Sequence, residues 1–387
     1  MVSRIFTEGG IEKLSYGYVP RHLPHREDYV QRLVGFFQIA SIDSGVPPRT
    51  ILIAGESGTG KTVTVKRVGV VLKSLAEKNK IWLEYVHLNC RLASGKFGLV
   101  QALVHQVAPE LPLRGYGSDG LLRSLLDYLN KEDRYLFLVL DEIDYFIRST
   151  GEDIICSLTH LTDSIQSFPQ RIHIVFIARD HSFQGLFDPS TRSAFAGATV
   201  EFPLYKEHEI RDILSERVEE AFRENVVSSE ILGFIVRNVR EYGFGDARYA
   251  LELLMMSGLV AERENSSAVL PEAVREAQSW VDPRIGTEDI DALSCAKKYV
   301  LLAIVREFKK EKESVYIPLA VVYQMYGVLS EEYGFEPVGE VYFQSLIGSL
   351  KDAMIIDVPE EDGDKIGLPG IKIDVLERAL VDSLRKS

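Results

Sequence analysis

The chain has 387 residues, of which 46% are hydrophobic, and its formal net charge at pH 7 is −13. This length suggests two or three domains, and the hydrophobic content is sufficient for real cores. The acidity argues mildly against a protein that coats nucleic acid non-specifically, although local basic clusters can still bind DNA. The cysteines form no metal or redox spacing, and neither a membrane span nor a secretory signal is visible. We therefore expect an intracellular, cytoplasmic protein.

The first predicted strand, Ile51–Ala54, leads into a glycine-rich turn. Gly55-x4-Gly60-Lys61-Thr62 matches the P-loop pattern in full, and the residues after Lys61 form a plausible helix. Backbone N–H groups of such a turn point toward phosphate, where the helix N-terminus adds positive potential. Lys61 would neutralise the β- and γ-phosphates of ATP, and Thr62 would ligate Mg²⁺. The predicted ATP/ADP-binding residues of this loop are Gly55, Glu56, Ser57, Gly58, Thr59, Gly60, Lys61 and Thr62.

A later predicted strand, Tyr135–Leu140, delivers two acidic residues at its carboxyl end, Asp141 and Glu142. Ligand sites of parallel α/β sheets lie at that end of the strands. Asp141 would hold Mg²⁺ through Thr62 or through water, and Glu142 would orient and polarise the attacking water. We interpret Asp144 as a cap of the helix that follows.

The remaining elements fit repeated strand–helix units followed by helices. Further strands are predicted at Leu83–Leu88, Ile172–Ile177 and Thr199–Phe202. From Lys206 to about Ala277 the pattern is helical, and "SWVDPRIGTED" is typical of a linker. The remainder, about 290–387, is predicted to form helices followed by two short strands.

These motifs together resemble a known family. The P-loop, the Asp-Glu motif and "GDARYALELLMMSG" resemble an AAA+ ATPase. More specifically, "YVPRHLPHRE", "LVLDEIDYF", "FDPSTRSAF" and "EFPLYKEHEIRDIL" resemble the archaeal origin-recognition/cell-division-cycle replication initiators, and the resemblance covers nearly all of the chain in the same order. It implies an α/β AAA+ P-loop core at residues 1–205, a helical lid at 206–285 and an α+β winged-helix DNA-binding domain at 290–387.

The resemblance also implies roles for residues outside the P-loop. "YVPRHLPHRE" matches the segment that closes over adenine, where the candidates are Val19, Pro20 and Arg26. Arg248 falls on the lid arginine that reaches the γ-phosphate, for which a forked donor at a helix start is suited. A solvated helix-face residue is the alternative for Arg248. Arg192 lies in the segment where AAA+ proteins offer an arginine to a neighbouring subunit's nucleotide, with an ordinary surface arginine as the alternative. With Glu142, these two arginines are the candidate catalytic residues.

The segment after the fourth strand departs from the family. The family usually has an Asn there, whose amide helps to position the attacking water, whereas "IVFIARD" has Arg179 followed by Asp180. Arg179 could contact the γ-phosphate directly or pair with Asp180. The expected enzymatic activity is therefore at most a weak ATPase, and nucleotide binding is the firmer expectation.

Two regions are expected to contact DNA. The C-terminal region resembles a winged-helix domain with helices in "SCAKKYVLLAIVREF", "YIPLAVVYQMYGVLSEEYG" and "VGEVYFQSLIGSLKDAM", the third usually inserted in the groove. The segment "IIDVPEEDGDKIGLPGIKID" is predicted to form the wing, a hairpin turning at Asp362-Gly363. From Ser294 to Ser387, 12 Lys and Arg face 16 Asp and Glu, and the wing turn is acidic. "GKFGLVQALVHQVAPELPLRGYGS" matches an extra DNA-contacting helical element of initiators, with a simple packing helix as the rival. The candidate DNA-binding residues are Lys96, Arg114, Lys351, Lys365 and Lys372.

The resemblance implies an archaeal-type replication initiator that binds origin duplex DNA and helps to recruit the replicative helicase. ATP would act mainly as a conformational switch, with slow hydrolysis resetting it. Expected partners are origin DNA, the replicative helicase and possible initiator paralogues, with a nucleoid-associated location and no membrane. One alternative is a signalling or transcription-regulating ATPase with a winged helix and no link to helicase loading. Another is a motor-like remodelling ATPase, which would need robust turnover.

Overall fold

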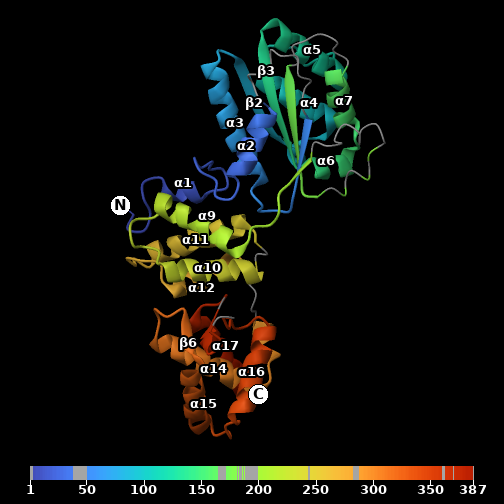
Figure 1. Cartoon of the computed structure of the whole chain (residues 1–387). Coiled ribbons are helices and arrows are strands. Elements are labelled where there is room, and N and C mark those ends of the chain that lie inside the picture. The colour runs from blue at the N-terminus through green and yellow to red at the C-terminus, as the bar shows by residue number, and fades with distance from the viewer. Residues whose placement is uncertain are drawn as a thin grey trace. The chain divides into compact units, whose positions relative to one another are not determined.

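The chain divides into two compact units, which are Val19–Tyr205 and the combination of Met1–Tyr18 with Lys206–Ser387. The structure, a computed structural model, describes residues 3–37, 50–163, 171–180, 182, 185, 187, 199–242, 245–281, 287–359, 362–368 and 370–386. Figure 1 labels the elements of both units.

A parallel sheet lies at the centre of the first unit (Figure 1). It has five strands in the order β2-β3-β4-β1-β5. The strands are β1 (Thr50–Ala54), β2 (Trp82–Asn89), β3 (Arg134–Asp141), β4 (Ile172–Ala178) and β5 (Thr199–Glu201). The register pairs Ala54 with Ala178 and Asn89 with Asp141, so the strands end at one common edge of the sheet. All five predicted strands and the predicted α/β parallel-sheet core are confirmed.

Helices cover both faces of this sheet, as a parallel sheet requires. One face packs on α2 (Glu27–Phe36) and α3 (Lys61–Lys78). The other packs on α4 (Gly95–Val107), α5 (Ser118–Lys131), α6 (Ile143–Thr150) and α7 (Asp153–Asp163). Side chains of β3 alternate between the two cores: Phe137 and Val139 join the first, and Leu138 and Leu140 join the second. A continuous apolar run is therefore what this central strand needs.

The second unit begins with helices that pack on the chain's first residues. These are α9 (Glu207–Ala221), α10 (Ser229–Tyr242), α11 (Ala247–Arg263) and α12 (Pro271–Val281), with the short α1 (Gly10–Leu14) beside them. The Thr7 N–H donates to the Ala221 carbonyl at 2.9 Å, and the Phe6 and Phe222 rings lie 4.9 Å apart. Residues 3–18, which the sequence pattern assigned to the 1–205 core, therefore belong to the lid side, because their apolar contacts are made there.

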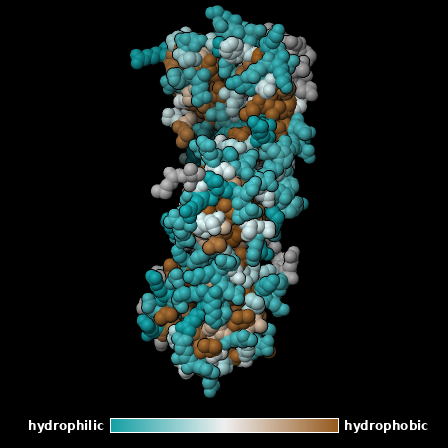
Figure 2. Space-filling model, turned by 90° about the vertical axis from the view of Figure 1, so that its left-hand side faces the viewer, coloured by the Kyte–Doolittle hydropathy of each residue, from teal (hydrophilic) through white to brown (hydrophobic). Residues whose placement is uncertain are grey.

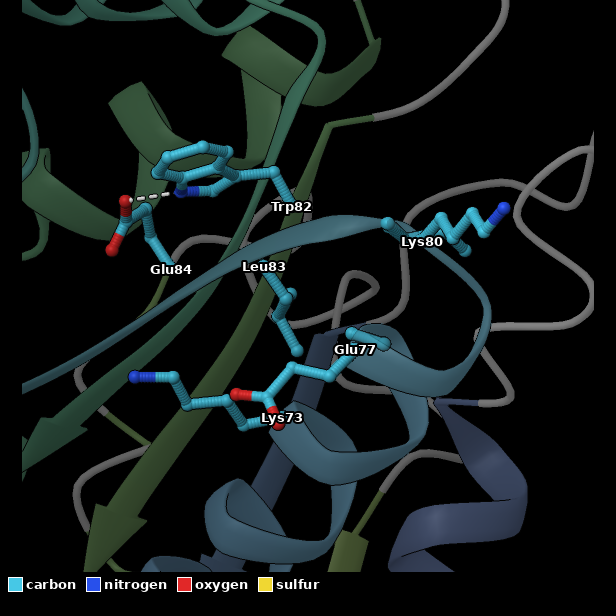
Figure 3. Close-up of a pocket in the computed structure, with 8 residues that line it drawn as sticks. Lys73, Glu77, Lys80, Trp82, Leu83 and Glu84 are labelled. Atoms are coloured by element: carbon cyan, nitrogen blue, oxygen red, sulfur yellow. Dashed lines mark hydrogen bonds between the residues drawn. The ribbon is translucent and has the colours of Figure 1, made fainter.

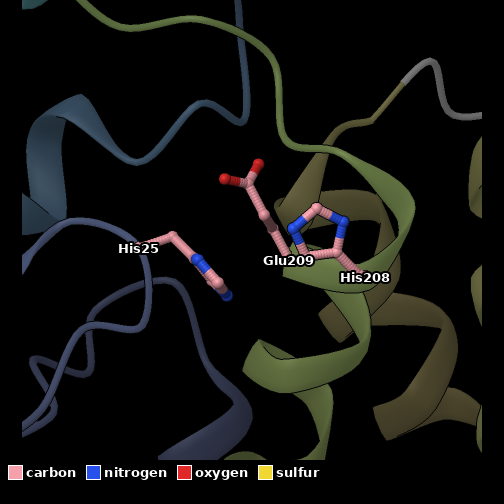
Figure 4. Close-up of side chains that lie close together, drawn as sticks. All are labelled: His25, His208 and Glu209. Carbon is pink, nitrogen blue, oxygen red and sulfur yellow. The ribbon is translucent and has the colours of Figure 1, made fainter.

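Side-chain acceptors cap the starts of two lid helices. The Lys206 N–H donates to a Glu209 carboxylate oxygen at 2.7 Å, and Figure 4 shows Glu209 next to His208 in the first turn of α9. Asp246 precedes α11, and its Oδ1 accepts from the N–H groups of Arg248 and Tyr249 at 2.7 and 3.2 Å. Such caps satisfy the N–H groups that a helix start leaves without partners.

The C-terminal part of this unit has a helical core with one small sheet. Its helices are α13 (Thr287–Asp291), α14 (Cys295–Lys310), α15 (Leu319–Tyr333), α16 (Glu340–Asp352) and α17 (Ile373–Lys386). Strand β6 (Tyr316–Pro318) pairs antiparallel with β7 (Lys365–Gly367), and Asp357 bridges Gly367. The predicted turn is present, since the Asp362 carbonyl accepts from the Lys365 N–H at 3.1 Å. Glu360 and Glu361 of that turn lie outside the described residues.

Two C-terminal expectations were wrong. The segment "YIP" begins no helix but forms β6, because Pro318 lacks the N–H of a helix interior and precedes α15. The end of the predicted wing, "IKID", turns into α17, whose Ile373, Leu376 and Leu380 are buried in the C-terminal core. These three residues follow helical spacing, which the short predicted strand overlooked.

One face of the molecule is mainly polar. Figure 2 shows one face on which hydrophilic residues predominate and hydrophobic residues form separate patches. Within the described ranges, no helix combines the length and apolarity that crossing a membrane requires.

Candidate nucleotide-binding site

The P-loop joins β1 to α3 at the edge where the strands end. Gly58 and Gly60 have φ values of 72° and 86°, in the left-handed region that favours glycine. At Gly60 a side chain would also collide, because an added Cβ would lie 2.3 Å from the Tyr205 hydroxyl oxygen. Both backbone conformation and space therefore demand glycine immediately before Lys61, where α3 begins.

Lys61 is enclosed by this loop and is only 8% exposed. Its Nζ donates to the carbonyls of Glu56, at 2.6 Å, and Gly55, and lies 3.4 Å from Thr59 Oγ1. The ammonium group thus lies within the loop at the N-terminus of α3. A phosphate bound there would meet both a cation and the positive end of a helix.

Asp141, at the end of β3, accepts hydrogen bonds from three groups. Its Oδ2 accepts from Thr62 Oγ1 at 2.8 Å and lies 3.1 Å from His87 Nε2, and its Oδ1 accepts from the Glu142 N–H at 2.9 Å. Burial raises the pKa of Asp141, but the bonds to His87 and Thr62 outweigh it, so the pKa is lower than usual. The carboxylate is therefore ionised at neutral pH.

The Thr62–Asp141 pair fits a magnesium ion. A hydroxyl and a carboxylate beside a phosphate-binding loop are the hard oxygen donors that Mg²⁺ prefers. Thr62 would hold the ion directly, and Asp141 would hold it directly or through water. The ion would neutralise charge on bound phosphates.

Glu142 and Asp144 differ from each other in environment. Glu142 is half-buried and precedes α6 with φ 56°, a left-handed conformation that is uncommon for non-glycine residues and clusters at functional sites. Asp144 was predicted to be a helix cap, which is wrong: β3 extends to Asp141, the chain turns at Glu142, and Asp144 lies inside α6. Asp144 is buried, and its Oδ1 accepts no hydrogen bond from the described residues.

Arg26 supports the P-loop from outside. It is 2% exposed and donates to the carbonyls of Thr59 at 3.0 Å, His25 at 3.0 Å and Pro203 at 2.8 Å. Its guanidinium carbon lies 3.9 Å from the centroid of the Tyr205 ring. These bonds tie the P-loop to the segment after β5. Of the two other residues predicted to lie near adenine, Val19 is half-buried and Pro20 is buried in the same unit.

The predicted arginines lie in different places. Arg179 directly follows β4; its carbonyl accepts from the Gly55 N–H at 3.1 Å, and its side chain is exposed. Asp180 accepts from the Ser182 N–H at 2.6 Å. Arg248 is exposed in the first turn of α11, with its guanidinium carbon 5.4 Å from the Tyr16 ring centroid, in the second unit. Arg192 lies outside the described residues.

Three of the five candidate DNA-binding residues form ion pairs with acidic side chains. Ion pairs join Lys96 to Asp119 at 3.0 Å, Lys365 to Asp362 at 2.8 Å, and Lys372 to Glu276 and Glu264 at 2.9 and 3.4 Å. Arg114 and Lys351 are exposed and form no ion pair with any other residue in the described ranges. These two are therefore the most accessible to phosphate.

Sequence reasoning missed Tyr85 and His87 of β2. The Tyr85 hydroxyl lies 3.0 Å from His87 Nδ1, so a chain of polar groups leads from β2 to Asp141. Only alternation along the strand marked these residues as sharing one face. The register that brings β2 beside β3 was needed to connect them to Asp141.

A second hollow lies at the opposite end of β2. It is lined by Lys73, Ala76, Glu77, Lys80, Ile81, Trp82, Leu83 and Glu84, and Figure 3 shows Trp82 Nε1 bonded to Glu84, at 2.8 Å. Trp82 begins β2, whereas the P-loop and Asp141 lie where the strands end. This hollow is therefore separate from the phosphate-binding edge.

Three families match successive parts of the chain. Residues 22–177 match the AAA ATPase domain, 211–279 the Cdc6 AAA+ ATPase-type lid domain, and 288–368 the CDC6 C-terminal winged helix domain. The order is that expected from the motifs. The lid and winged-helix matches account for the helices α9 to α12 and for the C-terminal helices with their small sheet.

Relatives extend over most of the chain. It is 33% identical over 327 residues to ORC1-type DNA replication protein 2 of Sulfolobus acidocaldarius, covering 83% of this chain and 78% of that protein. It is 31% identical over 351 residues to the ORC1-type DNA replication protein of Pyrococcus horikoshii, covering 89% and 82%.

Two solved structures agree with this relationship. Cdc6p of Pyrobaculum aerophilum is 26% identical, with a TM-score of 0.81 and 99% coverage of both chains. The Aeropyrum pernix ORC1 protein, solved in complex with DNA, is 26% identical with a TM-score of 0.64, covering 100% of this chain and 98% of that one. With its P-loop, acidic pair, lid and winged helix, the chain belongs to the archaeal ORC1/Cdc6 family of AAA+ DNA replication initiators.

Proposed function

We propose that this protein is an ATP-dependent replication initiator that binds duplex DNA at replication origins and helps to recruit the replicative helicase. The observation that carries the proposal is the presence, in one chain, of a P-loop with a Thr62–Asp141 pair and a winged-helix region. The DNA complex of the Aeropyrum pernix relative supports DNA as the ligand.

ATP or ADP would bind along the P-loop, from Gly55 to Thr62, with Lys61 on the phosphates. Thr62 and Asp141 would hold Mg²⁺. Val19, Pro20 and Arg26 would lie on the adenine side, where Arg26 already anchors the loop through Thr59. Arg248 would reach the γ-phosphate from the lid, so that ATP and ADP favour different lid positions.

Hydrolysis would be slow and would serve to reset the switch. Glu142 would orient the attacking water. Arg179 occupies the position where the family's Asn helps to place that water, and a guanidinium has no acceptor with which to do so. Arg192 would act on the nucleotide of a neighbouring copy.

DNA would be held by cations of two regions. Arg114, with Lys96 nearby in sequence, would contribute from the insertion after β2, and Lys351, Lys365 and Lys372 from the C-terminal region. The replicative helicase and other initiator paralogues would be partners, and the protein would act in the cytoplasm in association with the nucleoid.

One observation favours a second function. The region from Ser294 to Ser387 carries 16 acidic and 12 basic residues, a balance that suits a protein partner better than DNA. A signalling or transcription-regulating ATPase, with a winged helix but no link to helicase loading, is therefore the alternative.

Mapping of the bound chromosomal sites in the native organism separates these functions. Chromatin immunoprecipitation would be compared with the positions at which nascent DNA strands begin. The initiator proposal predicts occupancy at those positions. Occupancy confined to promoters would support the transcriptional alternative and overturn the proposal.

A further inference from the structure

Strand β2 supplies a polar chain that ends on Asp141. His87 Nε2 lies 3.1 Å from Asp141 Oδ2, and the Tyr85 hydroxyl lies 3.0 Å from His87 Nδ1. The side chains of His87 and Asp141 are 15% and 11% exposed, so solvent competes little for these bonds. Asp141 Oδ2 thus accepts from both Thr62, in the first turn of α3, and His87, in β2.

The donor directions follow from the ionised carboxylate. A carboxylate only accepts hydrogen bonds, so His87 Nε2 must carry the proton. The other ring nitrogen of a neutral imidazole is then an acceptor, and the Tyr85 hydroxyl donates to it. Burial, with the charge of Asp141 adding to it, raises the pKa of Tyr85, so the phenol retains the proton that this arrangement needs. With the imidazole neutral, the direction of donation is Tyr85 to His87 to Asp141.

A glycine in α3 makes room for the Tyr85 ring, with which the polar chain of side chains begins. Gly69 lies inside the helix, where glycine is unfavourable relative to alanine. An added Cβ would lie 2.5 Å from the nearest carbon of the Tyr85 ring. Tyr85 also stacks on Phe137 of β3, with ring centroids 5.8 Å apart. The ring is thus held between α3 and β3, which fixes where its hydroxyl points.

We propose that Tyr85 and His87 are positioning residues that hold Asp141 in the orientation in which it accepts the Thr62 hydroxyl, and that they thereby set how strongly nucleotide binding depends on Mg²⁺. The inference rests on the proposed nucleotide-binding function. Partners that orient a metal-site carboxylate typically change metal affinity by about 10–100-fold when they are removed. Without His87, the bond from Thr62 would be the only one of these two left on Asp141 Oδ2, and the carboxylate could rotate more freely.

Calorimetry of ATP binding, with Mg²⁺ and with EDTA, tests this inference. The quantity compared is the dissociation constant in EDTA divided by the dissociation constant with Mg²⁺. In His87→Ala the ratio should fall by about tenfold or more, with the value in EDTA unchanged. His87→Gln, whose amide nitrogen can donate to Asp141, should restore much of the ratio. Tyr85→Phe keeps the ring packing and should lower the ratio by a smaller factor. Gly69→Ala should also lower it, because the added methyl group would push on the Tyr85 ring.

Leu88→Ala is the matched control, because Leu88 follows His87 in β2 but packs in the core on the face of the sheet opposite to Tyr85. It should lower the melting temperature and leave the ratio unchanged. Equal ratios in the parent, His87→Ala and Tyr85→Phe would overturn the inference while leaving nucleotide binding intact. A ratio lowered equally by Leu88→Ala would also overturn it, because β2 stability alone would then explain the effect. A parent that binds no ATP would overturn the proposed function itself and the inference with it.

Discussion

Lys61 and Asp141 face the same small volume from different elements, one at the start of α3 and the other at the end of β3. Thr62 links them, since it follows Lys61 and donates to Asp141 at 2.8 Å. Cation, hydroxyl and carboxylate are thus held in place by a helix start and a buried strand. The chemistry expected of each can be tested one side chain at a time.

Lys61→Ala should abolish or greatly weaken ATP binding, because the ammonium group is the cation within the P-loop. ATP at about 100 times its dissociation constant stabilises a folded protein by about 2.7 kcal/mol. The parent should therefore show a rise in melting temperature with Mg-ATP that the variant lacks. Lys73→Ala, on an exposed turn of the same helix, should behave like the parent. Equal calorimetric affinity in Lys61→Ala and parent would refute the assigned role.

Glu142→Gln should retain ATP and slow its cleavage by at least about 100-fold, because the amide keeps the shape but loses the base. Phosphate release under single-turnover conditions measures this, and calorimetry checks that ATP remains bound. Unchanged phosphate release would remove Glu142 from the mechanism.

Arg179→Asn in the parent background should raise turnover. If turnover stays the same, that position does not limit hydrolysis.

The sequence predicted only some of the residues of this site. Lys61, Thr62 and Asp141 were expected together because the P-loop and a strand-end carboxylate have local patterns. Tyr85 and His87 were not, because their link to Asp141 depends on the register of two strands separated by more than 40 residues in sequence, from Asn89 to Arg134. A register of this kind has no local signature.

At the scale of elements, Arg275 of α12 joins the lid to the C-terminal strands. It is 0% exposed and donates to the carbonyls of Leu368 at 2.8 Å and Ser314 at 3.3 Å, with Glu272 as its ion-pair partner at 3.4 Å. Burial lowers the pKa of Arg275 to about 10, so it remains charged at neutral pH. Its guanidinium carbon also lies 4.5 Å from the Phe308 ring centroid.

Arg275→Met should destabilise the second unit by about 3–5 kcal/mol, because it leaves a partly buried carboxylate and several carbonyls without their donor. Urea unfolding followed by circular dichroism measures this. Arg263→Met is the control, because its side chain is 49% exposed and its ion pairs are worth about 0–1 kcal/mol. Similar unfolding curves for the two variants would contradict the anchoring role.

Elements with strong local patterns were predicted well, and elements set by distant contacts were not. The strands of the first unit and helices α14 and α16 follow apolar periodicity. Strand β6 exists because Tyr316 and Pro318 pair with residues of β7, far along the chain. Likewise, no local pattern in residues 3–18 predicts that they pack on α9, where Gly10 lies close to the Ala221 carbonyl.

For the whole molecule, DNA affinity should be modest and only weakly dependent on salt. Arg114 and Lys351 are the candidates that are exposed and form no ion pair in the described ranges. Each phosphate contact adds about −0.9 to the slope of log binding constant against log salt concentration, so two contacts give a slope of about −2. Fluorescence anisotropy with duplex DNA measures it. Lys351→Ala combined with Lys365→Ala should weaken binding, and neutralising Asp362 and Asp364 should strengthen it.

Lys372→Ala serves as the comparison for that experiment. Lys372 is held by Glu276 and Glu264 of the lid, so its loss should cost less DNA affinity than the loss of Lys351. A steep salt slope, or indifference to all of these substitutions, would show that another surface holds the DNA.

The central claim is that ATP controls binding to a defined DNA site. Footprinting on fragments of the native chromosome, with ATP and Mg²⁺ and again without nucleotide, tests it most directly. We expect the parent to protect a discrete sequence at a replication origin, with a protection pattern that changes when ATP is present. Lys61→Ala should give the nucleotide-free pattern under both conditions. Absence of any discrete protected sequence, or a parent pattern identical with and without ATP, would contradict the account.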